Sequence, residues 1–102
     1  MGIDVRWENE HGEALGVVDD PHNLLECLLP DPPDTSSCCL RFIDRYGDTV
    51  FNQLQMPQLA AELEDRAKIP LDAAAQEHLH ALLDLVRSAD GQVHTSIKFY
   101  GD

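Results

Sequence analysis

Basic residues are scarce in this sequence. Seven Lys and Arg stand against 19 Asp and Glu, so the formal net charge at pH 7 is −12. Proteins that bind DNA or RNA neutralise phosphates with clustered Lys and Arg, and anionic membranes attract basic segments. The shortage therefore predicts that neither a nucleic acid nor a membrane is a partner, and it favours a basic protein instead.

Long apolar runs are also missing. No stretch approaches the roughly 18 consecutive apolar residues that a membrane-spanning helix requires. The opening stretch, MGIDVRWENEHG, lacks the basic start and the apolar block of a signal peptide. These two observations predict a cytoplasmic protein.

Cysteine is limited to three residues, Cys27, Cys38 and Cys39. An odd number with two adjacent members does not make a disulfide framework, and it suits a reducing compartment. We expect free thiols that pack as small apolar groups. A bridge from Cys27 to one member of the adjacent pair is the alternative.

Motifs of catalysis and cofactor binding are absent as well. The sequence has no glycine-framed nucleophile, no phosphate-binding loop and no dinucleotide fingerprint. In the stretch EHLH, His78 and His80 would lie about 200° apart on a helix and could not share one ion. The sequence therefore predicts no cofactor, no metal site and no catalytic residue. It leaves open whether the protein is an enzyme, and it favours one that is not.

The hydrophobic pattern predicts both strands and helices. Strands are predicted over residues 3–8, 13–18, 38–43, 48–52 and 93–100, where apolar residues alternate or cluster. A short helix is predicted between Asp20 and Pro30; Pro57 opens a longer helix, and Asp72 and Gly91 bound another. Hairpins outnumber strand–helix–strand units. We therefore predict one α+β domain, residues 1–102, with a mainly antiparallel sheet of about five strands and both longer helices on one face.

Two side-chain placements follow from the same pattern. Trp7 alternates with charged residues beside Ile3 and Val5, so we expect it on the inner face of the sheet; an exposed anchor for a partner is the alternative. Glu62 is expected on the solvent side of the helix that Pro57 opens, opposite the apolar stripe.

The segment RFIDRYGDTVFNQLQMP, residues 41–57, is rich in hydrogen-bonding side chains. Asp44 and Gly47 are typical of a tight turn, with Gly47 in the left-handed region. Three amides are expected to bridge the strand and the helix start: Asn52, Gln53 and Gln55. The alternative is a small hydrolase or transferase in which Asp44 and Asp48 act as acid and base, with His94 assisting. The turn accounts for more of the residues, so we favour it.

Negative charge is concentrated near the beginning of the chain. Residues 1–34 hold nine acids and one base, which gives −8, whereas residues 35–102 give −4. If these carboxylates form one patch, they can attract a basic protein over a long range. The predicted partner-binding residues are acids of this region: Glu8, Glu10, Glu13, Asp19, Asp20, Asp31 and Asp34.

The segments RFIDRYGDTVFNQLQMP and IKFYGD are similar to segments of small standalone bacterial proteins without a characterised activity, a likeness that covers residues 40–102. Some small acidic proteins of this build resemble immunity proteins, which neutralise a toxin by binding it. The resemblance implies a binding protein and assigns no role to a numbered residue. We therefore predict an acidic protein-binding module, an immunity-type inhibitor that sequesters a basic partner such as a nucleic-acid-acting toxin. A homodimer joined through a sheet edge, with the last strand at that edge, is a further alternative.

Overall fold

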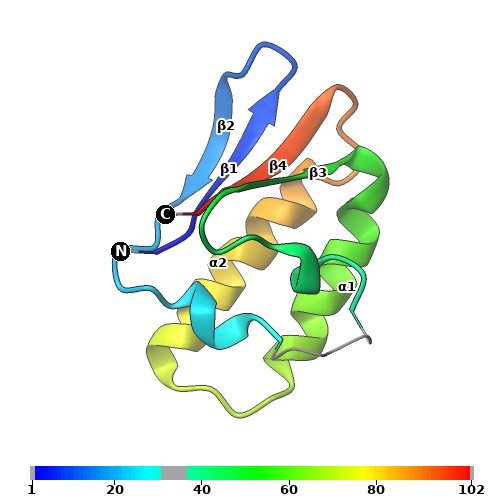
Figure 1. The fold of residues 1–102 in the computed structure, drawn as a ribbon. Coiled ribbons are helices and arrows are strands. Elements are labelled where there is room, and N and C mark those ends of the chain that lie inside the picture. Colours follow the sequence, from blue (N-terminus) through cyan, green and yellow to red (C-terminus); the bar gives the residue numbers. More distant parts are fainter. Residues whose placement is uncertain (1, 31–36, 102) are drawn as a thin grey trace.

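The computed structural model describes residues 2–30 and 37–101. Four strands form one antiparallel sheet: β1 (Asp4–Asn9), β2 (Ala14–Val18), β3 (Asp48–Asn52) and β4 (Thr95–Tyr100). The strand order is β2-β1-β4-β3, and two helices, α1 (Met56–Ala67) and α2 (Ala73–Ala89), cover one face of the sheet (Figure 1). The α+β class and the antiparallel sheet with two helices are confirmed.

The core lies between the sheet and the helices. Val5 of β1 pairs with Phe99 of β4, and Ile97 pairs with Phe51 of β3, so these side chains share the inner face and are buried. The rings of Phe51 and Phe99 meet edge to face, with their centroids 5.7 Å apart. Trp7 is partly buried against the same core, as its alternation with charged residues predicted.

The helix boundaries follow local signals. Pro57 lies in the first turn of α1, where a missing backbone N–H costs nothing. The Asp72 carboxylate accepts a hydrogen bond from the Ala75 N–H at the start of α2, and Gly91, just beyond the end of α2, has φ 81°. These caps and the apolar stripe of α2 are confirmed. In the described part of the chain, neither helix is long and apolar enough to cross a membrane.

The predicted strand over residues 38–43 is wrong, so the sheet of the described chain has four strands rather than the predicted number of about five. Residues Leu40–Phe42 form a 3₁₀ turn, because the Glu62 carboxylate accepts hydrogen bonds from the backbone N–H groups of Cys38, Cys39 and Leu40. Three successive amides that point at one acceptor cannot alternate as they do in a strand. β3 consequently pairs with β4 instead of with the preceding segment.

Two further predictions are corrected. The short helix between Asp20 and Pro30 is reduced to a 3₁₀ turn, Leu25–Leu28. The last strand begins at Thr95, because His94 has a positive φ of 60° that no strand residue adopts. That strand lies between β1 and β3, so it offers no edge for the predicted homodimer.

Candidate interaction surface

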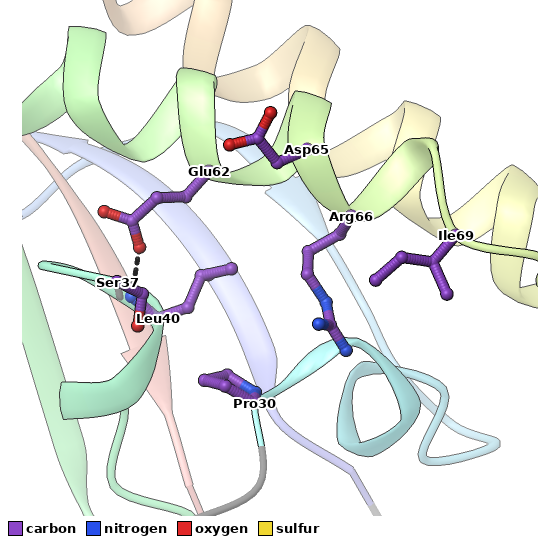
Figure 2. Close-up of a pocket in the computed structure, with 7 residues that line it drawn as sticks. All are labelled: Pro30, Ser37, Leu40, Glu62, Asp65, Arg66 and Ile69. Atoms are coloured by element: carbon purple, nitrogen blue, oxygen red, sulfur yellow. Dashed lines mark hydrogen bonds between the residues drawn. The ribbon is translucent and has the colours of Figure 1, made fainter. Parts of the chain in front are cut away.

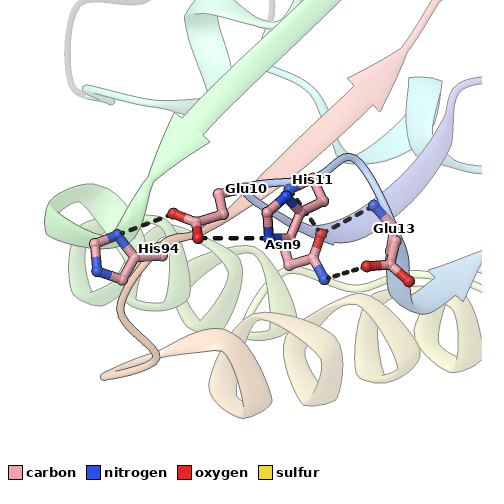
Figure 3. Close-up of polar contacts among 5 residues, drawn as sticks. All are labelled: Asn9, Glu10, His11, Glu13 and His94. Atoms are coloured by element: carbon pink, nitrogen blue, oxygen red, sulfur yellow. Dashed lines mark hydrogen bonds and ion pairs between the residues drawn. The ribbon is translucent and has the colours of Figure 1, made fainter.

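The tip of the β1–β2 hairpin is organised by Asn9 (Figure 3). Its Oδ1 accepts hydrogen bonds from the backbone N–H groups of His11 (2.9 Å) and Glu13 (3.0 Å), and its Nδ2 donates to Glu13 Oε1. Gly12 completes the turn with φ 78°. The turn satisfies its own backbone amides, and the side chains of Glu10, His11 and Glu13 are exposed.

His94, in the loop before β4, lies beside this tip. Its Nδ1 is 3.5 Å from Glu10 Oε2, and His11 Nε2 is 3.6 Å from Glu10 Oε1. The positive φ of His94 costs a non-glycine residue about 1–2 kcal/mol. A hydrogen bond of 3.1 Å from its N–H to Gln53 Oε1 helps to hold that conformation. Gln53 thus accepts a hydrogen bond from an otherwise unpaired backbone amide, as predicted, but that amide belongs to His94, which lies 41 positions later in the chain.

A shallow depression of about 500 Å³ adjoins His94. It is lined by residues from the end of β3 and the start of β4: Asn52, Gln53, Leu54, Val93, His94 and Thr95. Leu54 is 82% exposed and Val93 is 63% exposed, so two apolar side chains are in contact with water here. The hairpin tip and the depression share one end of the sheet, since Asn9 pairs with Thr95 and Asn52 with Ser96. We call their exposed residues the hairpin-end surface: Glu10, His11, Glu13, Leu54, Val93 and His94.

Two of the predicted partner-binding acids are not on the surface. Glu8 is 9% exposed; its carboxylate accepts a hydrogen bond from the Tyr100 hydroxyl, which raises the pKa of Tyr100. Asp20 is 0% exposed, and its carboxylate accepts hydrogen bonds from the N–H groups of Leu24 (2.6 Å) and Leu25 (3.0 Å). Both carboxylates serve internal contacts, so Glu8 and Asp20 leave the set of candidate contact residues.

The other predicted acids do not form one patch. Asp31 and Asp34 lie outside the described residues. Glu10 and Glu13 belong to the hairpin-end surface, whereas Asp19 follows the far end of β2. Glu13 and Asp19 are six positions apart, which an extended chain spans in about 20 Å. The carboxylates therefore lie at both ends of the hairpin.

Most of the positive charge is already paired. Within the described residues, five of the seven Lys and Arg side chains lie within 4.0 Å of a carboxylate, in the pairs Arg6–Glu8, Arg45–Glu26, Lys68–Asp65, Arg87–Glu64 and Lys98–Asp48. No Lys or Arg of the described chain pairs with Glu10, Glu13 or Asp19. The hairpin therefore carries carboxylates that no neighbouring Lys or Arg neutralises.

The structure does not bring together the three residues of the predicted catalytic alternative, Asp44, Asp48 and His94. Asp48 lies 3.7 Å from Lys98 Nζ, and Asp44 accepts a hydrogen bond from the Tyr46 N–H. Asp44 precedes β3 and Asp48 is its first residue, whereas His94 lies beyond the other end of β3, beside Gln53. The turn prediction is confirmed for Asp44. Gly47 does not adopt the left-handed region; a Cβ there would lie 2.7 Å from Asp44 Oδ2, which explains the glycine.

A cavity of about 140 Å³ lies beside Glu62 (Figure 2). Sequence reasoning placed Glu62 in solvent, but it is 7% exposed and accepts hydrogen bonds from three backbone amides and from Gln58. Burial acts to raise the pKa of the carboxyl, and these hydrogen bonds outweigh it, so the pKa of Glu62 lies below its usual range. The cavity is smaller than the roughly 300–1,000 Å³ of small-molecule sites. We assign Glu62 a structural role.

The cysteines are free: Cys27 and Cys38 are exposed and Cys39 is buried. Burial, with the nearby Glu62 carboxylate, raises the pKa of the Cys39 thiol to about 11, so this thiol is protonated at neutral pH.

Comparison of the chain with protein-family models, with curated proteins and with solved structures found no match. We therefore infer a function from the residues of this chain alone.

Proposed function

We propose that this chain is a protein-binding module that captures a basic protein, as an immunity protein neutralises a nucleic-acid-acting toxin. The supporting observation is the uncompensated charge of the β1–β2 hairpin. Glu10, Glu13 and Asp19 are exposed and have no Lys or Arg partner among the described residues, although the chain pairs most of its cations elsewhere. A cytoplasmic location is part of this proposal.

The proposed capture has two stages with different physical origins. The carboxylates attract the partner before contact, because the attraction between exposed charges extends over about 10 Å at moderate salt. Leu54 and Val93 then lose contact with water when the partner covers the depression beside His94. Charge accordingly governs the association rate, and apolar burial governs the dissociation rate.

A lysate capture experiment with a charge variant tests the proposal. The immobilised protein is incubated with native lysate at several salt concentrations, and the captured proteins are identified by mass spectrometry and purified for binding measurements. The hairpin variant removes three charges: Glu10→Gln, Glu13→Gln and Asp19→Asn. The control variant removes three charges from exposed helix positions: Asp65→Asn, Glu77→Gln and Asp84→Asn.

We expect a basic protein that binds at low salt and dissociates as salt rises. The hairpin variant should slow its association about tenfold, the lower end of electrostatic steering effects. The control should leave association within about twofold, because these distant charges are screened. Equal effects of the two variants would show that only net charge matters, and capture of no basic protein at low salt would refute the proposal.

A further inference from the structure

Strand β2 is apolar, yet none of its residues is fully buried. Its sequence is ALGVV, and none of its five residues is buried, whereas each of the other three strands contributes buried residues to the core. Leu15 is 47% exposed and Val17 is 49% exposed. About half of each of these two side chains therefore remains in contact with water in the described part of the structure.

β2 is also an edge of the sheet. It pairs with β1 on one side and with no described strand on the other, as Figure 1 shows. Proteins usually protect such edges with Lys, Pro, inward-pointing charges or bulges. β2 contains no charged residue and no proline, and its one irregularity is a bulge at Leu15, because Trp7 pairs with Gly16 and Glu8 pairs with Ala14. Gly16, Val17 and Val18 remain in regular register, so their outer edge is open to another strand.

The charges that flank β2 select the kind of strand that fits. Glu13 precedes the strand and Asp19 follows it, and both are exposed. If two copies paired antiparallel along residues 16–18, the Glu13 end of each copy would lie beside the Asp19 end of the other. Like charges brought together across a strand pair destabilise it. The edge therefore disfavours a second copy of this chain and matches a strand with a cation at each end.

We infer that the open edge of β2 receives an extended segment of the basic partner, which adds a fifth strand to the sheet. This inference rests on the proposed function and specifies how the partner binds. The segment carries Lys or Arg about six positions apart, near Glu13 and Asp19, with β-branched residues between them whose methyl groups cover Leu15 and Val17. Backbone hydrogen bonds to β2 provide affinity, and the two end charges provide specificity.

A peptide titration of the ¹⁵N-labelled protein tests this inference. The probe is the acetylated and amidated peptide KVTVTVK, whose end charges have the required separation. Two control peptides have the same sequence and charge. One is N-methylated at its even-numbered residues and the other at its odd-numbered residues, so that each has one hydrogen-bonding edge of the strand blocked. A third control, EVTVTVE, reverses the charge. Chemical shifts and amide exchange are followed at residues 13–19.

We expect KVTVTVK to shift the resonances of β2 and to slow exchange of its amides. At least one N-methylated peptide should bind about tenfold more weakly, because it loses several net hydrogen bonds. EVTVTVE should not bind, whereas the double variant Glu13→Lys, Asp19→Lys should prefer EVTVTVE over KVTVTVK.

Three results would overturn the inference. They are equal binding of both N-methylated peptides, perturbation confined to other residues, and no binding of KVTVTVK at millimolar concentration. If any of these occurs while lysate capture still depends on the hairpin charges, the partner binds without strand addition and the proposed function stands. If lysate capture fails as well, the proposed function falls too.

Discussion

The buried carboxylate of Glu62 provides the sharpest test of how this fold is held together. It accepts hydrogen bonds from the backbone N–H groups of Cys38 (2.9 Å), Cys39 (3.1 Å) and Leu40 (2.9 Å), and from Gln58 Nε2 (2.8 Å). The residues it joins lie 22 to 24 positions earlier in the chain, so it fastens their turn to α1. We therefore expect Glu62→Gln to lower the free energy of unfolding strongly.

The magnitude follows from the number and type of these bonds. A hydrogen bond to a charged group contributes about 1.5–3 kcal/mol, but bonds that share one carboxylate are not additive. In Glu62→Gln the amide oxygen still accepts, while the amide NH₂ now faces backbone donors. We expect a loss of about 2–4 kcal/mol, which a domain with about 5–15 kcal/mol of stability can survive.

Urea denaturation monitored by circular dichroism measures this loss. Glu64→Gln is a matched control two residues away in α1, because Glu64 is exposed and pairs with Arg87 at the surface. Removing such a pair should cost less than about 1 kcal/mol. A loss for Glu62→Gln no larger than that of Glu64→Gln would refute the structural role of Glu62.

The pH dependence of this difference has a defined sign. The pKa of Glu62 is lower in the folded protein than its usual value, so the folded state favours the ionised carboxylate. Its contribution is fully present above the unfolded-state pKa, about 4.3, and is lost as pH falls through the folded-state pKa. The difference between the wild type and Glu62→Gln should be constant near neutrality and should shrink in acid. A difference that grows on acidification would contradict the assignment.

Two further predictions concern the packing of the described chain. Gly101→Ala should lower the thermal midpoint and cost about 1–3 kcal/mol, because a Cβ there would lie 2.6 Å from two backbone oxygens; an unchanged midpoint would contradict this packing. In native protein, a thiol reagent should label the exposed Cys27 and Cys38, whereas Cys39, buried and with its pKa raised to about 11, should react only after unfolding. Mass spectrometry counts the labelled thiols, and rapid native labelling of Cys39 would refute its burial.

Local signals predicted much of the fold. The alternation around Val5 and around Ile97 marks the inner face of β1 and β4, and the spacing of apolar residues marks both helices. Asp72 and Gly91 bound α2 as capping chemistry requires. These features depend on residues within a few positions of each other, so the sequence alone determines them.

Tertiary structure decided the environment of each carboxylate. Glu8, Asp20 and Glu62 resemble their exposed neighbours in sequence, but each is buried. Each also lies near a distant residue: Glu8 accepts a hydrogen bond from Tyr100, Asp20 lies 3.9 Å from His78 of α2, and Glu62 binds the turn at Leu40. For Glu62 the partners are the amides that replace the predicted strand over residues 38–43 with a turn. The position of β4 in the centre of the sheet was likewise beyond local reasoning, because strand order depends on contacts between distant segments.

The same division applies to the candidate surface. Composition alone determined that the protein is strongly acidic, and therefore which partners its charge repels. Only the folded chain determined that Glu10 meets His94 and that Glu13 and Asp19 flank an apolar, open strand. The physical reason is that net charge is a sum over residues, whereas a binding surface depends on which residues the fold leaves unpaired and exposed.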